Sequence, residues 1–447
     1  MNPVLDVDEL SLRDRHRFAQ LVRPKVGLME CVLSLQQEPT APPFDIGTAS
    51  IGNLTMTFPH VANDSGTDVR FGALGGAGAD VAAANAWVKA VVEGAERYSC
   101  MVHDDDDFIF ATRDDLGDDA MDLSAVPRLS EREYADPACP FKPPDPRKPI
   151  RWTRAWSMLD RREVLIPAVM THLYLDARPG EEFWQPISTG VAAHTSLGKA
   201  LVAAICESIE RDAIALTWLC RLQLPMIDID DPPPAVLTPA LDRLRRSKVR
   251  QFFFDATTDL GIPTVYSVQL VDGHDKLAQF VGCATDFDAA AACAKTIRES
   301  TTSRTVFLGS YEPPENVADF TSLYDGAARM GRPDAREAFR FLLDSPRRRA
   351  LSEVQVNAPS DDKERIRMLL QRLAALQMDA FAVDLTTDEV RDAGLWVVRV
   401  VIPQLVPMSS VHRARYLGHR RIYEYPEKAG FGRMTEDAIN PAPQPFA

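Results

Sequence analysis

Glutamates spaced three residues apart recur in two stretches of the sequence. The stretch ANAWVKAVVEGAERYS contains Glu93 and Glu96, and KALVAAICESIERDA repeats the spacing 114 residues later with Glu207 and Glu210. A third stretch, AACAKTIRESTTSR, shares part of the layout and contains Glu299. Because residues i and i+3 are neighbours on one face of a helix, each pair would present two carboxylates side by side.

Carboxylates this close repel one another unless a cation or a proton offsets their charge. Their hard oxygen ligands suit Mg²⁺, which commonly binds one or two carboxylates together with substrate phosphates. In each stretch an alanine precedes the first glutamate by seven residues, so the same face is narrow at one end. These alanines are Ala86, Ala200 and Ala292. If the three helices converge, five glutamates surround one cavity.

An alternative is that each ExxER segment is a solvated helix face with local Glu/Arg pairs. The flanking sequences VVEGAERY and AAICESIERDAIALTW are, however, too apolar for a surface helix. The recurrence of the layout with matching alanines favours buried helices that carry acidic groups.

Hydrophobic periodicity and runs of β-branched and aromatic residues predict alternating groups of strands and helices. The expected helices cover residues 81–101, 196–222, 287–307, 335–344 and 361–376. The expected strands cover residues 151–159, 164–170, 251–258, 263–271, 277–285, 379–387 and 395–403. Because several strands follow one another directly, we expect an α+β fold of largely antiparallel sheets flanked by helices, with an internal pseudo-repeat.

The breaks in the pattern indicate one large fold, since none is a flexible Gly/Ser linker. We expect an N-terminal arm or small lobe over residues 1–60, where IGNLTMTF begins a β-like segment, and one large domain over residues 61–447. Residues 103–150 are polar and proline-rich, which predicts a surface excursion. Residues 434–447 form a proline-rich tail.

Composition excludes several classes of protein. Acidic residues exceed basic ones, 64 against 50, and the net charge of −14 disfavours phosphate-led binding of nucleic acid. There is no secretory signal and no apolar run of membrane-spanning length, so we expect a cytoplasmic protein without a membrane anchor. The seven cysteines form no CxxC pair or zinc-like cluster and are interpreted as reduced, mostly buried thiols.

These motifs resemble the signatures of the YcaO-domain family. STGVAAHTSLGKALVAAICESIERDAIALTW (188–218) is similar to the central signature and GGAGADVAAANAWVKAVVEGAERYS (75–99) to the first. ESTTSR (299–304) and LWVVRVVIPQLVPM (395–408) resemble the last signature and the strand that follows late in that fold. The resemblance extends from about residue 20 to the end of the chain.

The resemblance implies the YcaO fold and an enzyme that uses ATP and Mg²⁺ to activate a peptide amide. Carried over by motif position, the metal ligands would be Glu93, Glu96, Glu207, Glu210 and Glu299. The expected nucleotide contacts are these five residues together with Lys25, Lys89, Arg211 and Arg304. No Walker-type GxxxxGK[ST] motif is present, and the spacing in GALGGAG does not fit a dinucleotide fingerprint.

The ending NPAPQPFA resembles the proline-rich C-terminus of azoline-forming cyclodehydratases, which reaches towards the active site. The resemblance therefore assigns Pro441, Pro443 and Pro445 to the catalytic site. An alternative is a frayed polyproline II end without a role. The chain departs from the family pattern at Ala77 and Lys89, where lysine and serine are common, and at Thr302, where glutamine is usual.

The expected activity is therefore conversion of Cys, Ser or Thr in a ribosomally made precursor peptide to thiazoline or oxazoline. The resemblance also implies a separate E1-like partner that binds the leader peptide, and an FMN-dependent dehydrogenase that acts afterwards. Thioamide formation, amidine formation and a non-catalytic subunit remain the alternatives at this point. A further alternative is an accessory factor of the kind once proposed for this family in methylthiolation of a ribosomal protein.

Overall fold

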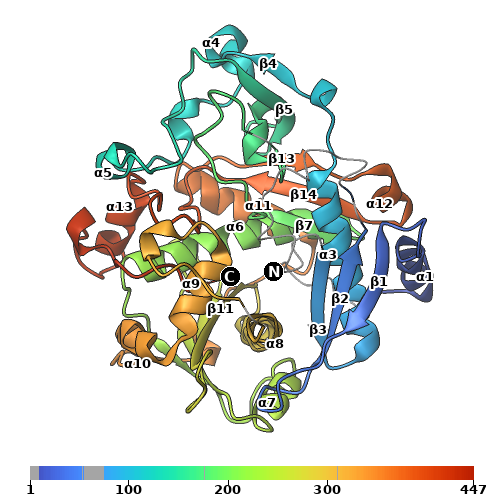
Figure 1. Cartoon of the computed structure of the whole chain (residues 1–447), viewed down its shortest axis with the longest axis vertical. Coiled ribbons are helices and arrows are strands. Elements are labelled where there is room, and N and C mark those ends of the chain that lie inside the picture. Colours follow the sequence, from blue (N-terminus) through green and yellow to red (C-terminus); the bar gives the residue numbers. More distant parts are fainter. Residues whose placement is uncertain (1–9, 53, 55–74, 176, 310, 447) are drawn as a thin grey trace.

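The computed structural model describes residues 10–52, 54, 75–175, 177–309 and 311–446. Within these residues the chain forms three sheets, each carrying one long helix (Figure 1). These helices are α3 (Ala83–Met101), α6 (Leu197–Leu219) and α8 (Ala289–Phe307). The expected α+β class with largely antiparallel sheets is confirmed.

The first sheet packs against α3 through a glycine-rich strand. Its order is β1 (Met29–Ser34), β2 (Asp45–Ile51), β3 (Gly75–Asp80), and α1 (Leu12–Leu21) contacts α3 from the side. A Cβ atom on Gly76 would lie 2.2 Å from the carbonyl oxygen of Ala90 in α3. The glycine-rich stretch is therefore a strand whose lack of side chains lets the helix approach closely.

The second sheet packs against α6 and extends to the top of the molecule in Figure 1. Its order is β4-β5-β13-β14-β7, with β6 paired to β5. The bounds are β4 (Ile109–Ala111), β5 (Ile150–Ser157), β6 (Arg162–Pro167), β7 (Val191–His194), β13 (Phe381–Asp384) and β14 (Trp396–Val401). The helix α11 (Asp362–Ala375) packs beside α6.

The third sheet carries α8 and has the order β11-β10-β9-β8-β12. Its pairs are antiparallel apart from the parallel pair β12 and β8. The bounds are β8 (Met226–Asp228), β9 (Arg250–Asp255), β10 (Thr264–Leu270), β11 (Gln279–Thr285) and β12 (Arg348–Ala350). The other helices are α4 (Arg113–Leu116), α5 (Glu131–Ala135), α7 (Thr238–Leu244), α9 (Leu323–Gly331), α10 (Arg340–Leu343), α12 (Asp388–Asp392) and α13 (Arg421–Lys428).

The three sheet-and-helix units contact one another in a closed cycle. Each long helix directly follows a strand of its own sheet, namely β3, β7 or β11. In addition α3 contacts β7, α6 contacts β11 and α8 contacts β3. Each helix therefore meets the strand that precedes the next helix, and the cycle turns the sequence repeat into a ring of three units.

Apolar side chains fill the space between the helices and their sheets. Among the largest fully buried side chains are Trp152 of β5, Trp218 of α6 and Tyr266 of β10. The Trp218 ring lies 5.2 Å from the ring of Phe339 and 5.8 Å from that of Phe341. Aromatic packing of this kind fixes the C-terminal end of α6 against the third unit.

The predicted long helices over 81–101, 196–222, 287–307 and 361–376 agree with α3, α6, α8 and α11 to within a few residues. The helix expected at 335–344 is a 3-10 segment, Pro333–Phe339, followed by α10. The seven expected strands correspond to β5, β6, β9, β10, β11, β13 and β14. Most of IGNLTMTF and the expected boundary between residues 60 and 61 lie outside the described residues.

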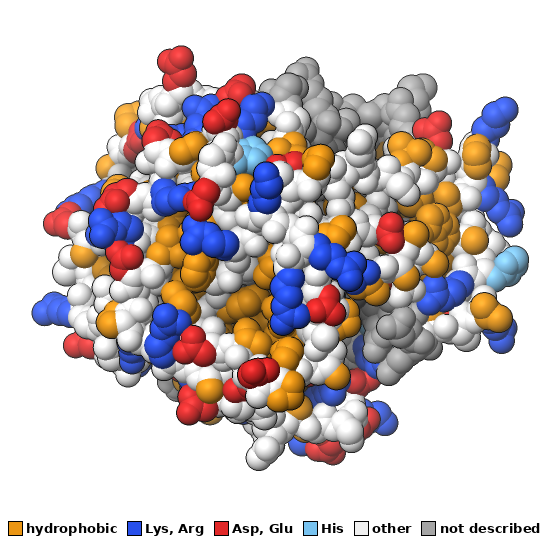
Figure 2. Space-filling model, turned by 90° about the horizontal axis from the view of Figure 1, so that it is seen from below, with side chains coloured by type: hydrophobic (Ala, Val, Ile, Leu, Met, Phe, Trp, Pro, Cys, Tyr) orange, Lys and Arg blue, Asp and Glu red, His pale blue; other side chains and the backbone are white. Residues whose placement is uncertain are grey.

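Figure 2 shows basic and acidic side chains interspersed on the face of the molecule seen from below. On that face the acid excess is not gathered into one patch. In the described part of the chain no helix is both long enough and apolar enough to cross a membrane.

Candidate active site

Two buried glutamates and an arginine form the centre of the site on α6. Glu207 is 2% exposed and Glu210 1% exposed. The Arg211 guanidinium donates from Nη2 to Glu207 Oε1 at 3.0 Å and from Nη1 to Glu210 Oε1 at 3.1 Å. Burial alone would lower the pKa of Arg211, but the two carboxylates outweigh burial and raise it.

The second oxygen of each carboxylate accepts a backbone N–H from a sheet. Glu207 Oε2 accepts from Gly190 N at 3.0 Å, just before β7, and Glu210 Oε2 accepts from Thr285 N at 3.0 Å, at the end of β11. Gly190 has φ +77°, and a Cβ there would lie 2.3 Å from the Val400 carbonyl oxygen. Only glycine fits this position without strain, so the donor to Glu207 is fixed by the backbone.

A buried lysine that the sequence motifs did not single out joins α8 to this centre. Lys295 Nζ lies 3.3 Å from Glu210 Oε2 and 3.8 Å from Glu299 Oε1. Burial alone would lower the pKa of Lys295, but the two carboxylates outweigh burial and raise it. Burial raises the pKa of Glu299 to about 7, against the opposing effect of Lys295. The available signal was a lysine one helical turn before Glu299.

The glutamates of α3 have the same kind of surroundings. Glu93 Oε2 accepts from Ala77 N of β3 at 3.0 Å, and Glu93 Oε1 lies 3.4 Å from Arg97 Nη2. Glu96 is buried at 2% exposure. Burial alone would lower the pKa of Arg97, but Glu93 and Glu96 outweigh burial and raise it.

Glutamates of α3 and α6 both act on the buried Cys100 thiol. Burial, together with Glu96 and Glu207, raises the pKa of this thiol to about 12. The carboxylates of the two helices therefore act on the same group. A direct ion pair joins α6 to α8.

The proline-rich tail returns along α6 to the buried carboxylates. Asn440 donates from its side chain to the Trp218 carbonyl at 3.1 Å, and Trp218 Nε1 donates to the Ala442 carbonyl at 3.1 Å. The Arg211 guanidinium lies 4.9 Å from the centroid of the Phe446 ring. The residue that reaches the charged centre is thus Phe446, which the sequence analysis did not single out.

Two of the three expected tail prolines are buried in the structure. Pro443 and Pro445 are buried, whereas Pro441 is exposed. Pro443 lines a pocket beside α6. The described contact with Arg211 is therefore aromatic, a cation–π arrangement.

Two cations expected at the site have other partners. Lys89, expected as a nucleotide contact, forms an ion pair with Asp80 at 2.5 Å. Arg304 donates to the Leu277 carbonyl at 3.0 Å and lies 3.8 Å from Glu38. Five residues of helix place Arg304 about 140° around α8 from Glu299, which explains why it faces elsewhere.

The third expected cation is Lys25. It and two positions that depart from the family pattern, Thr302 and Ala77, have defined places in the structure. Lys25 is exposed in the turn between α1 and β1, with φ +76°. The Thr302 hydroxyl donates to the Arg298 carbonyl at 3.1 Å, a bond within α8. Ala77 contributes its backbone N–H to Glu93, so the missing lysine side chain does not remove this contact.

The carboxylates suit a metal ion that is bound by protein carboxylates and by phosphate oxygens together. Within the described residues, no three Asp, Glu, His or Cys side chains lie close enough to hold an ion by themselves. The buried glutamates are instead paired with Arg211, Lys295 and Arg97. Such a donor set fits Mg²⁺ bound through one or two carboxylates and substrate phosphates, the usual arrangement for this ion.

Comparison with known proteins identifies the family of the chain. Residues 75–406 match the model of the YcaO family, described as an ATP- and Mg²⁺-binding cyclodehydratase. An uncharacterized protein of the tfuA 3′ region of Rhizobium leguminosarum bv. trifolii is 32% identical over 174 residues, which cover 36% of this chain and 41% of that protein.

Two solved structures show the same fold. A heterocyclase in complex with substrate and cofactor superposes with a TM-score of 0.79 at 21% identity, covering 100% of this chain and 59% of that one. The YcaO protein of Methanopyrus kandleri bound with AMPPCP and Mg²⁺ gives a TM-score of 0.61 at 14% identity, covering 89% and 90%. The chain thus spans less than two thirds of the Rhizobium relative and of the heterocyclase. The family match over most of its length nevertheless shows that this chain belongs to the YcaO family.

Proposed function

We propose that this chain is an ATP-dependent cyclodehydratase that converts Cys, Ser or Thr of a ribosomally made precursor peptide to thiazoline or oxazoline. The observation that carries the proposal is the buried cluster of Glu207, Glu210, Arg211 and Lys295, closed by Phe446 of the returning tail. A cluster of this kind, in a family described as binding ATP and Mg²⁺, suits phosphoryl transfer.

In the proposed reaction the side-chain thiol or hydroxyl of the peptide adds to the preceding amide carbonyl carbon. The former carbonyl oxygen then attacks the γ-phosphorus of ATP, and ADP leaves. Departure of phosphate with that oxygen forms the C=N bond of the azoline, while the amide nitrogen and the nucleophile each lose their proton. The peptide thus loses the elements of water, which appear in the conversion of ATP to ADP and phosphate.

The residues of the chain divide this work by charge. Glu93, Glu96, Glu207, Glu210 and Glu299 would hold Mg²⁺ and through it the phosphates. The ion would neutralise phosphate charge and polarise the transferred group. Arg211 and Lys295 would stabilise the charge that develops on the phosphoryl oxygens. Phe446 would cover Arg211 and keep water from the centre.

We propose that the chain works with an E1-like protein that binds the leader of the precursor peptide. An FMN-dependent dehydrogenase would then oxidise azolines to azoles. Equal ATP-dependent cyclisation by the purified chain with and without such a protein would contradict the first of these proposals.

The test is co-expression with a precursor peptide encoded near the gene, followed by mass spectrometry of the peptide. Each azoline removes the mass of one water, and release of ADP and phosphate in the purified reaction must match the number of rings. Replacement of oxygen by sulfur would identify a thioamide former instead. Unchanged product formation by Glu207→Gln would refute the catalytic assignment and support a non-catalytic subunit.

A further inference from the structure

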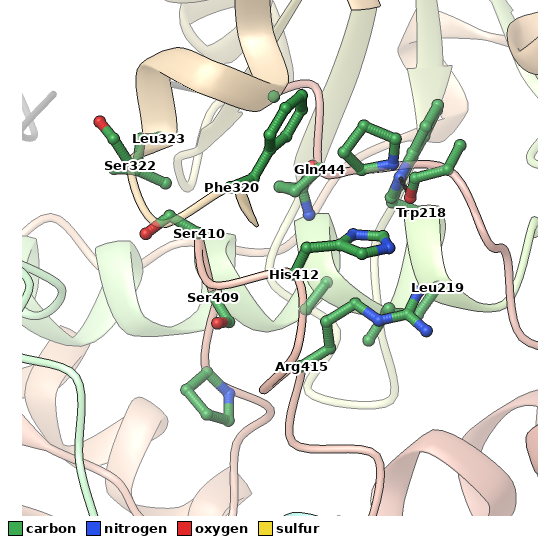
Figure 3. Close-up of a pocket in the computed structure, with 15 residues that line it drawn as sticks. Trp218, Leu219, Phe320, Ser322, Leu323, Ser409, Ser410, His412, Arg415 and Gln444 are labelled. Carbon is green, nitrogen blue, oxygen red and sulfur yellow. Dashed lines mark hydrogen bonds between the residues drawn. The ribbon is translucent and has the colours of Figure 1, made fainter. Parts of the chain in front are cut away.

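A pocket lies beside the tail (Figure 3), and none of the paired carboxylates lines it. It is bounded by the C-terminal end of α6, the start of α9, the segment after β14 and residues 442–444 of the tail. Its cavity volume is about 20 Å³, and it is partly open to solvent. The mechanism proposed above gives this space no role.

The pocket combines apolar walls with positive charge. Trp218 and Phe320 contribute aromatic walls, whereas His412 and Arg415 extend from the segment after β14 towards α6 in Figure 3. The described residues that line the pocket include no carboxylate. A bound group would therefore meet cationic and hydrogen-bonding groups at one side and rings at the other.

The arginine of this pocket has no carboxylate within ion-pair distance among the described residues. Arg415 Nη1 donates to the Asn440 carbonyl oxygen at 2.7 Å. Burial lowers the pKa of Arg415, although Glu133 and Glu436 act in the opposite direction. A partly buried cation that forms no close ion pair favours an anionic ligand.

The neighbouring histidine adds a neutral hydrogen-bonding group. Burial, together with Arg415 and Arg413, lowers the pKa of His412 to about 4. Its imidazole is therefore uncharged near pH 7 and can donate from one nitrogen. His412 thus supports a carboxylate at Arg415 without adding a second charge.

Two distances along the chain relate the pocket to the charged centre at Arg211 and Phe446. Along α6, the wall residues Ala215 and Trp218 lie four and seven residues beyond Arg211, a rise of about 6 to 10 Å. Along the tail, Pro443 lies three residues before Phe446, or about 9 Å in polyproline II geometry. An extended peptide covers such a distance in about two to three residues.

We propose that the pocket is a specificity subsite for an acidic side chain, Asp or Glu, two or three positions from the peptide bond that is activated. The proposal rests on the proposed function, since it takes the peptide as substrate. The carboxylate would pair with Arg415, and the methylene groups would lie against Trp218 and Phe320. An amide or a basic side chain at this position leaves the Arg415 charge uncompensated and binds more weakly.

The test uses small probes that need no precursor peptide. Binding of N-acetyl-glutamate α-amide and of the isosteric N-acetyl-glutamine α-amide to the full chain is measured by ligand-observed NMR. We expect the glutamate probe to bind at least tenfold more tightly, the usual scale of a charged hydrogen bond. Equal affinities, or no saturable binding of the glutamate probe, would overturn the proposal.

Variants assign the preference to the pocket. Arg415→Gln can still donate to the Asn440 carbonyl but carries no charge, so it should lose the tenfold preference, whereas Arg415→Lys should retain part of it. Arg413→Gln is the matched control, because Arg413 pairs with Asp136 and Asp319 instead. A preference that survives in Arg415→Gln, or disappears in Arg413→Gln, contradicts the assignment to this pocket.

The proposal and the underlying function fail in different ways. Glu207→Gln should abolish ATP turnover while leaving probe binding unchanged, because Glu207 does not line the pocket. With a precursor peptide that the chain cyclises, changing the acidic residue to lysine should reduce cyclisation at the neighbouring site at least tenfold, and Arg415→Glu should restore it. No loss on the lysine change would refute the subsite even if cyclisation itself is established.

Discussion

The contact between Gly326 and the tail offers a direct way to move the tail without touching the charged centre. Gly326 lies in α9, and the carbonyl oxygen of Gln444 passes directly over its Cα. An alanine at this position would place its Cβ 2.0 Å from that oxygen. A carbon and an oxygen in contact lie about 3.3 Å or more apart, so helix and tail must separate by about 1.3 Å.

The effect of this displacement on the rate of cyclisation can be estimated. Phe446 follows Gln444 by two residues and lies over Arg211, so a shift of the tail changes the cover of the charged centre. Misplacement of groups by about 1 Å can reduce a rate about a hundredfold. Glycine to alanine within a helix also adds up to about 1 kcal/mol of helix stability, so global stability should change little. We therefore expect Gly326→Ala to lose about two orders of magnitude in ATP-dependent cyclisation with a nearly unchanged melting temperature.

Hydrogen exchange measured by mass spectrometry reports on the tail independently of any activity. The Asn440 N–H donates to the Leu219 carbonyl at 2.8 Å, so this amide should be protected in the wild type and exchange faster in Gly326→Ala. Gly52→Ala is the matched control, since no atom of the described residues lies within 4 Å of the added Cβ. A variant truncated after Asn440 gives the activity of the protein without the tail, for comparison. Wild-type exchange together with wild-type turnover in Gly326→Ala would refute the reasoning.

Three further outcomes follow from the described contacts. Glu207→Gln should reduce ATP turnover at least a hundredfold with little loss of folded protein, as measured by ADP release and circular dichroism, and removal of Mg²⁺ by EDTA should do the same. Lys295→Met leaves two buried carboxylates with less compensation, so the free energy of unfolding in urea should fall by about 3 to 5 kcal/mol; a fall below 1 kcal/mol would contradict the buried pairing. In thiol titration of the native protein, the half-buried Cys31 and Cys139 should react before the five buried cysteines, which should react only on unfolding. Fast labelling of a buried cysteine in the folded state would be inconsistent with this structure.

The regular elements were largely predictable because their patterns are local. A long apolar periodicity such as that of 196–222 suits only a buried helix, and α6 is found there. The strands β3 and β7 escaped detection because they consist of glycine, alanine and few branched residues. Their pairing is imposed by the neighbouring strands and by the close approach of the helices, which no local propensity contains.

The glutamates and Arg211 could be predicted from the sequence, but the other residues of the site could not. The spacing of Glu207 and Glu210 places both on one face of a helix, but their cations come from different sources. Arg211 is adjacent in sequence, whereas Lys295 lies 85 residues from Glu210 and is brought there by the fold. Phe446 is likewise placed by the path of the tail along α6. Charge compensation between distant segments therefore could not be deduced from spacing.

The hydrogen bonds of the glutamates indicate why a repeated helix can form one site. The first carboxylate of each pair binds the backbone of its own unit, Glu93 to Ala77 and Glu207 to Gly190, with separations of 16 and 17 residues. Glu210, the second of its pair, instead binds Thr285 at the end of the next unit's strand, 75 residues away. One position of the repeat thus fixes a helix to its own sheet, while the other joins α6 to the next unit. A substitution at Glu207 should consequently act within its own unit, whereas one at Glu210 should loosen the contact between two units as well as the charged centre.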